Sequence, residues 1–258
     1  MTFNSIRSSQ FAGNLSEYAT VITNDYSDIK WNNHINIAVY VGTFDPPHLN
    51  HKMVVESVFA TGFIDAVIIV PTYKHCCKNN ISSFDDRFNM LLSMFENTLN
   101  VAISPIEKEL CELHEKNVNY THDTLTLLNR QLPNATLYLT IGSDLFESFS
   151  TWDNVDMYLN QNIIVVCRDK YSIYTTDTLT EKLLDNNKLT IIGKDMPLSN
   201  INSTAIREKI ADDNTQDLIG IVPARVLQYI SNKSSLLNHY KKNKTSTRDI
   251  RSYFTQTK

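Results

Sequence analysis

The sequence predicts an α/β protein with a doubly wound, Rossmann-like parallel sheet, flanking helices and a single domain. Three observations predict this fold. Short apolar runs recur along the chain and are nearly continuous, which is typical of parallel strands covered by helices on both faces. Segments with helical apolar spacing follow these runs, as expected for strands joined by helical crossovers. At 258 residues the chain is long enough to bury one sizeable core.

The apolar runs predict six strands. In the first, Ile35 to Val41 are nearly all apolar or β-branched. The second ends at Pro71, which cannot donate a ladder hydrogen bond and so closes the strand. We expect the strands at 35–41, 65–71, 101–104, 135–141, 162–167 and 189–192.

Helical spacing is clearest after the second strand, where Phe84, Phe88, Leu91 and Phe95 form one apolar stripe that we assign to the core. Thr121 is a good N-cap for the next helix, because its hydroxyl can accept from a backbone amide of the first turn. The last helix of the main body is expected over 223–230.

The chain divides into an N-terminal extension (1–34), a main domain (35–231) and a basic C-terminal tail (232–258). In the extension, Phe11, Leu15, Tyr18 and Ile22 fit one amphipathic helix packed on the main domain. The tail reads as a weakly ordered helix or as a contact in a homo-oligomer.

Composition narrows the class of protein. A net charge of −4 gives no global basic field, so we expect neither a nucleic acid nor an anionic membrane as partner. No apolar run approaches the roughly 18 residues needed to span a bilayer, so a cytoplasmic protein is expected. The four cysteines form no C-x-x-C pair, and free thiols fit a reducing compartment.

The segment Ile35 to Glu56, INIAVYVGTFDPPHLNHKMVVE, carries the strongest functional signal. It predicts a strand, a turn that begins at Gly42, and a helix. Backbone amides beside the positive end of a helix dipole form a phosphate site. His48 and His51 share one side of the first helical turn, where both can donate to one oxyanion. A metal pair and two exposed loop histidines are the alternatives, and the metal pair has no third ligand of convincing spacing nearby.

Four later stretches add polar residues at the ends of strands or the starts of helices. After the second strand comes PTYKHCCKNNISSFDDRFNML, and NYTHDTL begins a helix. GSD follows the fourth strand, where an aspartate can hold a ribose or cap a helix. INSTAIR offers hydroxyls at a helix start and Arg207 one turn later, within reach of phosphate. A capping box explains Ser203 but leaves Arg207 unexplained.

Together these motifs resemble the nucleotidyltransferase superfamily, and in detail the nicotinate (or nicotinamide) mononucleotide adenylyltransferases. GTFDPPHLNH is similar to G-x-F-D-P-x-H-x-G-H, and INSTAIR to I-S-S-T-x-I-R. The resemblance runs from about Ile35 to Ile230 and recurs at six places in order, so 35–231 is identified as a nucleotidyltransferase domain. Asn50 stands where the family has glycine, and Asn202 where it has serine.

The resemblance implies a role for each matching residue. Trp152, eight residues after G-x-D, resembles the tryptophan that stacks on the pyridine ring, although core packing is the better reading of a lone tryptophan. The implied catalytic residues are His48, His51, Lys78 and Arg207. The implied substrate contacts are Gly42, Thr43, Phe44, His75, Tyr120, Thr121, Asp123, Gly142, Asp144, Trp152, Arg168, Ser203 and Thr204.

The implied reaction joins ATP to nicotinate or nicotinamide mononucleotide and releases pyrophosphate, as in NAD biosynthesis. Mg²⁺ is expected with ATP, and no metal ligands on the protein are expected. Two alternatives stay open. Another nucleotidyltransferase, acting on phosphopantetheine or transferring a cytidylyl group, would share the main motifs. A non-catalytic nucleotide-binding protein is the second alternative, and Asn50 and Asn202 are the residues that favour it.

Overall fold

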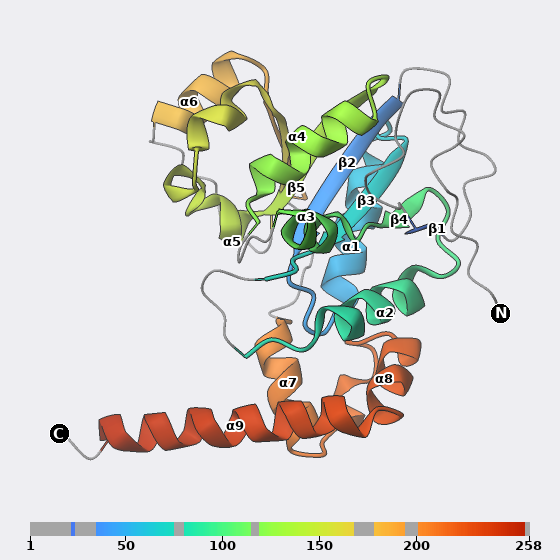
Figure 1. Cartoon of the computed structure of the whole chain (residues 1–258), viewed down its shortest axis with the longest axis vertical. Helices are drawn as coiled ribbons and strands as arrows, with labels where there is room; N and C mark the ends of the chain where they lie inside the picture. Colours follow the sequence, from blue (N-terminus) through green and yellow to red (C-terminus); the bar gives the residue numbers. More distant parts are fainter. Residues whose placement is uncertain are drawn as a thin grey trace.

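The computed structural model describes residues 22–23, 35–74, 80–114, 119–167, 178–193 and 201–255, with the backbone alone at 22–23 and 245–255. Figure 1 shows a central sheet, with helices on either side of it and a long C-terminal helix below it. The expected segments at His75, Lys78 and Arg168 lie outside the described residues.

In the described part of the chain the sheet has seven strands in the order β1-β4-β3-β2-β5-β6-β7. All neighbouring pairs are parallel except β1 with β4. The six expected strands are therefore confirmed, with ends that shift by one residue in places. The strands are β1 (Ile22–Thr23), β2 (Ile35–Gly42), β3 (Ala66–Pro71), β4 (Val101–Ile103), β5 (Ala135–Gly142), β6 (Asn162–Val166) and β7 (Leu189–Ile192).

The strand order makes the sheet doubly wound, as the sequence predicts. From β2 the chain moves outward through β3 and β4, then returns to the other side of β2 and continues through β5, β6 and β7. The order therefore reverses between β2 and β5, and ligands of such sheets bind outside the strand carboxyl ends at this point. Gly42 ends β2 and Gly142 ends β5 at this edge.

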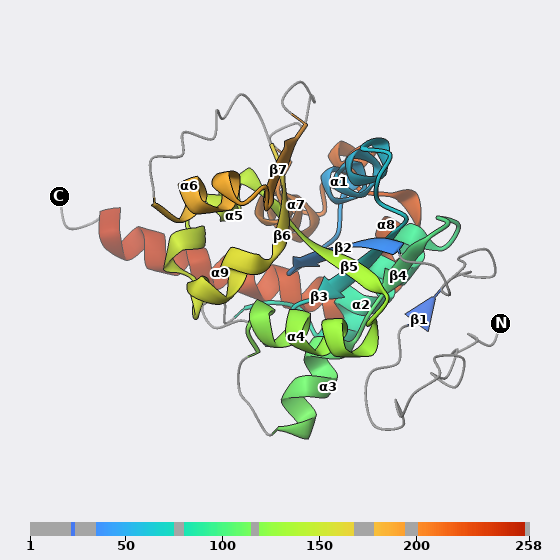
Figure 2. The same ribbon diagram turned by 90° about the horizontal axis from the view of Figure 1, so that it is seen from above.

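Helices cover both faces of the sheet, as Figure 2 shows from above. Side chains of β2 alternate between two cores: Ala38 and Tyr40 face one, and Ile37 and Val39 face the other. The helices are α1 (Leu49–Ala60), α2 (Phe84–Phe95), α3 (Ile106–Leu113), α4 (Thr121–Gln131), α5 (Ser143–Phe146), α6 (Thr178–Asp185), α7 (Ser203–Ala211), α8 (Ala224–Ser231) and α9 (Ser234–Thr255). Short 3₁₀ segments are η2 (Phe149–Thr151), η3 (Val155–Asn160) and η4 (Gln216–Leu218).

The two cores assign each helix to a face. The first core takes side chains from α1, α2, α7, α8 and α9, and the second from α3, α4, α5 and α6. The expected stripe on α2 follows this pattern: Phe84, Leu91 and Phe95 are buried, and Phe88 packs partly buried against them. None of the described helices is long and apolar enough to cross a membrane.

Two local expectations were wrong. Ile22 belongs to β1, where it pairs with Ile103 of β4, so it does not continue a helix from Phe11. The backbone groups of β1 are paired with those of β4. This pairing between distant segments cannot be read from the spacing of apolar residues along the chain. The N-cap of α4 is Tyr120, and Thr121 is the first helical residue.

The helix α9 begins in the segment expected as a tail, and its first half is packed into the first core. Leu236 and Tyr240 are each only 2% exposed. Lys241 and Lys244 pair with Asp213 and Asp212, which directly follow α7. Up to Lys244, the prediction of a weakly ordered helix was therefore wrong. Leu236 and Tyr240 are four residues apart, so they lie on one face of the helix and pack together into the first core.

Replacement of Leu236 by Ala should lower the free energy of unfolding by about 2–5 kcal/mol, because it leaves a cavity beneath α9. Leu99 is 65% exposed, so Leu99→Ala is the matched control and should change stability by less than about 0.5 kcal/mol. Urea denaturation followed by circular dichroism measures both. Equal effects of the two substitutions would contradict the packing of α9.

Candidate active site

The turn between β2 and α1 is held in an unusual backbone conformation. Phe44 is buried with a φ of 54°, a region that few residues with side chains adopt. Its ring folds back over Gly42, where an added Cβ would lie 2.9 Å from the ring Cζ. Because the buried ring has little room to move, position 42 requires glycine.

His48 and His51 come together at the start of α1, as the sequence predicts. His48 is the N-cap, and its backbone amide donates to Nδ1 of His51 at 3.0 Å. The neutral His51 ring therefore carries its proton on Nε2 and can donate there. The two ring centroids are 3.8 Å apart and both side chains are buried, so the alternative of two exposed loop histidines was wrong.

At the start of α1, at least one backbone amide that the sequence suggested for phosphate binding is already hydrogen-bonded within the protein. The amide of Leu49, the first residue of α1, donates to the carbonyl of Ile221 at 2.9 Å. The chain itself thus satisfies one of the four amides that a helix N-terminus leaves unpaired. This amide is therefore not available to a phosphate, and the side chains of the two histidines are the candidate donors at this turn.

The INSTAIR motif at the start of α7 is hydrogen-bonded to the turn between β2 and α1. Ser203 Oγ donates to the carbonyl of Pro46 at 3.0 Å, and Arg207 Nη1 donates to the carbonyl of Asp45 at 2.7 Å. Arg207 Nη2 also lies 3.2 Å from Thr204 Oγ1. Residues about 160 positions apart in sequence therefore form one site at the end of β2.

Both departures from the family pattern have structural roles. Asn50 Nδ2 donates to the carbonyl of Ile201 at 3.1 Å and so adds another bond between the two motifs. Asn202 is the N-cap of α7, and its Oδ1 accepts from the amide of Ala205 at 2.9 Å. Ser203 and Thr204 have hydroxyls that could cap this helix, but the cap is one residue earlier.

Arg87 supports the turn from inside the protein. Its side chain is fully buried and donates to the carbonyls of Thr43 at 2.9 Å and Ser82 at 3.1 Å. Burial lowers the pKa of Arg87, while Asp45 and Glu107 favour its charged form. Arg87 thus holds the carbonyls of the turn from within the core.

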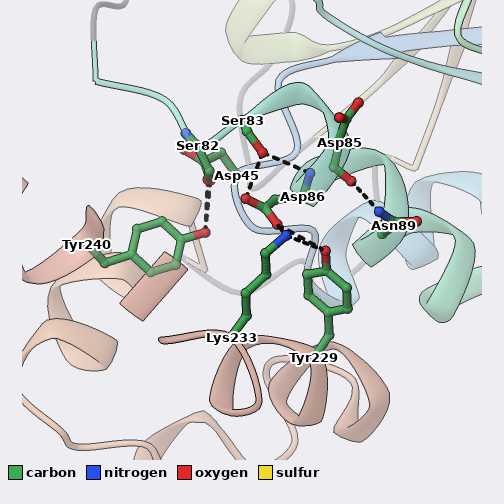
Figure 3. A network of polar contacts seen from close by, with 9 residues as sticks. All are labelled: Asp45, Ser82, Ser83, Asp85, Asp86, Asn89, Tyr229, Lys233 and Tyr240. Atoms are coloured by element: carbon green, nitrogen blue, oxygen red, sulfur yellow. Dashed lines mark hydrogen bonds and ion pairs between the residues drawn. The ribbon is translucent and has the colours of Figure 1, made fainter. Parts of the chain in front are cut away.

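The carboxylate of Asp45 is the centre of a buried polar network. It accepts from the amide of Ser82 at 3.0 Å, from the Ser82 hydroxyl and from the Tyr240 hydroxyl at 2.9 Å. Figure 3 shows Tyr240 reaching this cluster from α9. Neither Ser82 nor Tyr240 was expected from the sequence.

A second group of expected residues meets around Tyr158. Its hydroxyl is hydrogen-bonded to the side chain of Thr121 and the backbone of His122, and burial raises its pKa, so it stays protonated. Trp152 is half-buried and meets Tyr158 and Phe149 edge-on, with centroids 5.8 Å and 5.0 Å away. This tryptophan therefore packs on the core and is also accessible to solvent.

The remaining expected contacts surround these two groups. Gly142 is the N-cap of α5 and pairs with Val166, and Asp144 lies exposed in the first turn of α5. Tyr120 is 43% exposed, and its ring stacks on His122 with a centroid separation of 5.7 Å. Asp123 is half-buried, with Oδ1 3.5 Å from Nε2 of His122.

No group of three or more His, Cys, Asp or Glu side chains in the described ranges could hold a metal ion. The site therefore presents a paired-histidine turn, a buried supporting network and an aromatic group, all at the carboxyl edge of β2 and β5. These features define the class of doubly wound domains that bind nucleotides at the point where the strand order reverses.

Comparison with known proteins agrees with this class and narrows it. The family model described as cytidylyltransferase-like matches residues 39–209. The probable nicotinate-nucleotide adenylyltransferase of Borrelia turicatae is 32% identical over 203 residues, covering 78% of this chain and 97% of that protein. The nicotinate-nucleotide adenylyltransferase of Bacillus subtilis is 28% identical over 196 residues, covering 75% and 94%. The chain therefore belongs to the cytidylyltransferase-like family, within which these curated relatives are nicotinate-nucleotide adenylyltransferases.

A solved structure confirms the fold. The Plasmodium falciparum nicotinic acid mononucleotide adenylyltransferase complexed with NaAD superposes with a TM-score of 0.63 at 24% identity. The match covers 80% of this chain and 98% of that one. The same enzyme complexed with APC gives a TM-score of 0.62.

Glu107, at the start of α3, is a buried acid next to this site. Its Oε2 accepts from the amide of Tyr73 at 3.0 Å. Burial raises its pKa to about 8, against the opposing effects of the Tyr73 amide and the charge of Arg87. The folded protein therefore holds a proton on Glu107 at pH values where the unfolded chain has released it.

This proton makes stability depend on pH in a defined direction. Between the ordinary pKa of 4.5 and the folded value of about 8, unfolding releases a proton, so stability falls as pH rises. The slope from this group is about 1.4 kcal/mol per pH unit at most. Glu107→Gln should flatten the curve between pH 5 and 8, measured by urea denaturation at each pH. Glu112→Gln, at an exposed position of α3, should keep the wild-type slope, and an unchanged slope in Glu107→Gln would contradict the buried proton.

Proposed function

We propose that the protein transfers AMP from ATP to nicotinate mononucleotide, giving the dinucleotide precursor of NAD and pyrophosphate. The observation that carries this proposal is the union of the two signature motifs at the end of β2, through Ser203, Arg207 and Asn50. The names of the curated relatives point to the same reaction.

The reaction needs no nucleophile from the protein. A phosphate oxygen of the mononucleotide attacks the α-phosphorus of ATP, and the bond from that phosphorus to the oxygen bridging to the β-phosphate breaks. Pyrophosphate leaves with the electron pair. Catalysis then consists of placing the two phosphates in line and stabilising the negative charge that develops.

We assign the ATP side of the site to the turn. His48 and His51 would donate to the phosphates, with His51 using Nε2, because its Nδ1 accepts from His48. Arg207 commits two N–H directions to Asp45 and Thr204, and a guanidinium has five, so further donors remain for the triphosphate. Lys78 would add a point charge. Gly42, Thr43 and Phe44 would line this side.

We assign the mononucleotide side to the end of β5 and the start of α4. Trp152 would stack on the pyridine ring, since its edge-on contacts with Tyr158 and Phe149 hold the indole plane. Thr121, held by Tyr158, would meet the ring's acid group. Asp144 would accept from ribose hydroxyls. Tyr120, Asp123 and Gly142 would complete this side, with Ser203 and Thr204 near the phosphates. For His75 and Arg168 we keep the substrate-contact role that the resemblance implies.

Mg²⁺ enters this proposal as part of the substrate, bound to the triphosphate of ATP. Such an ion keeps most of its waters and binds chiefly through phosphate oxygens, so the protein need not supply several carboxylates. It would neutralise the leaving pyrophosphate. We further propose that the enzyme works in the cytoplasm without nucleic acid or membrane as partner.

The proposal favours catalysis over simple nucleotide binding. Asn50 and Asn202 were the residues that favoured a non-catalytic protein, and each has a bonding role that supports the two motifs. Pyrophosphate release with ATP and Mg²⁺ tests the reaction directly. Nicotinate mononucleotide should be the preferred acceptor, with nicotinamide mononucleotide, phosphopantetheine, and CTP in place of ATP as comparisons. If only phosphopantetheine served as acceptor, or only CTP as nucleotide donor, the proposed reaction would be replaced by that one. ATP binding without turnover of any acceptor would refute catalysis.

The role of His51 can be separated from its structural bond. In His51→Asn, the side-chain oxygen can replace Nδ1 and accept from the His48 amide, but the Nε2 donor is lost. We expect kcat to fall roughly 100-fold or more, as for the loss of one donor to a developing oxyanion, with the melting temperature nearly unchanged. The exposed His114 supplies the matched control, His114→Asn, which should keep full activity. A His51→Asn enzyme with near-normal kcat would contradict the assignment.

A further inference from the structure

We propose that Tyr240, on the C-terminal helix α9, is a positioning residue that holds the phosphate-binding turn through the carboxylate of Asp45. The proposal rests on the proposed function for the identity of ATP as the ligand of that turn. Tyr240 lies beyond residues 39–209, the part of the chain that the family model covers.

Asp45 needs its donors because it is buried. Only 1% of the residue is exposed, and an ionised carboxylate away from water is costly unless hydrogen bonds replace its hydration. Its side-chain partners in the network are Ser82, through amide and hydroxyl, and Tyr240, at 2.9 Å. Ser82 directly precedes α2, whereas Tyr240 comes from the distant C-terminal helix α9.

The backbone of Asp45 belongs to the site. Its carbonyl accepts from Arg207, and the next carbonyl, of Pro46, accepts from Ser203. His48 follows two residues later. A movement of the Asp45 side chain therefore moves the peptide groups that orient Arg207 and the histidine pair.

The hydroxyl of Tyr240 is fixed in place from two directions. Leu236, one turn earlier, is buried in the core, and Lys241 pairs with Asp213 at the end of α7. The helix α7 also carries Ser203 and Arg207, which hydrogen-bond to the turn. The helix α9 is therefore packed against the same helix that holds the turn. Exposed ion pairs contribute little alone, so the buried side chains of α9 supply most of the hold.

Tyr240 remains a donor over the working range of the enzyme. Burial, and then the negative charge of Asp45, raise the pKa of Tyr240 well above its ordinary value. The hydroxyl is therefore protonated and directed at Oδ1 of Asp45. A hydrogen bond to a charged group is among the stronger ones in proteins.

The chain offers a matched control for the removal of this hydroxyl. Tyr229 of α8 donates to the carboxylate of Asp86 at 2.9 Å, and Asp86 also pairs with Lys233. Figure 3 shows both tyrosine and carboxylate pairs side by side. Asp86 lies on α2, where it bonds with Ser83, Tyr229 and Lys233, so Tyr229→Phe removes the same kind of bond away from the turn.

The test compares Tyr240→Phe with Tyr229→Phe in the full chain. We expect Tyr240→Phe to weaken binding of α,β-methylene-ATP about tenfold and to lower kcat/KM for ATP equally, because a bond to a charged group is lost. The KM for nicotinate mononucleotide should change less than about twofold, since that substrate is assigned to β5 and α4. Tyr229→Phe should leave all three values unchanged. Circular dichroism at the assay temperature shows that both variants are folded.

A double-mutant cycle shows whether Tyr240 acts through Asp45. If it does, adding Tyr240→Phe to Asp45→Ala, which removes the acceptor, should cost much less in nucleotide binding than Tyr240→Phe costs alone. Additive losses, or equal effects of Tyr240→Phe and Tyr229→Phe on nucleotide binding, would overturn the proposal and leave Tyr240 a purely structural residue. Nucleotide binding is measured without an acceptor, so the result stands even if the wild-type chain fails to use nicotinate mononucleotide. That failure would refute the proposed function separately.

Discussion

The carbonyl groups of Asp45 and Pro46 are the point at which the whole site is assembled. They lie in a turn whose backbone bends sharply at Phe44, and a loop of this shape does not hold itself in place. Arg207 and Ser203 bind the carbonyls from α7, while Arg87 binds the preceding carbonyl of Thr43 from α2. The histidine pair is well directed because the turn before it is held on both sides. Without these three donors, we expect the sheet to remain folded but the turn to lose the conformation that the site requires.

Much of the fold could be predicted because its signals are local. Continuous apolar runs such as Ile35–Val41 identify buried parallel strands, and the glycine and proline residues after them mark the turns. The motifs also assign His48, His51, Ser203 and Arg207 to one site, and in the structure Ser203 and Arg207 of α7 hydrogen-bond to the turn that precedes the two histidines. The GSD motif predicts a ligand site at the end of its strand, beside the point where the strand order reverses, and the sheet order places β5 next to β2.

The interactions that the sequence could not predict are those between distant segments. Asp45 is one of several polar residues in the motif GTFDPPHLNH, and nothing near it in the sequence indicates that Ser82 and Tyr240 donate to its carboxylate. The basic composition of the last 27 residues suggested a weakly ordered helix or an oligomer contact, and did not reveal the buried pair Leu236 and Tyr240. Similarly, Thr121 has the ideal chemistry for an N-cap, yet tertiary packing starts the helix one residue earlier.

The position of Tyr240 also orders the events by which the protein matures. As the chain leaves the ribosome, all seven strands have been synthesised once residue 192 has been added. Arg207 follows fifteen residues later, and Tyr240 is added a further 33 residues after Arg207. The strands are thus synthesised early, but the chain lacks the Tyr240 donor to Asp45 until this part of α9 has been added. A chain that stops before α9 would therefore leave the carboxylate of Asp45 without the Tyr240 hydroxyl.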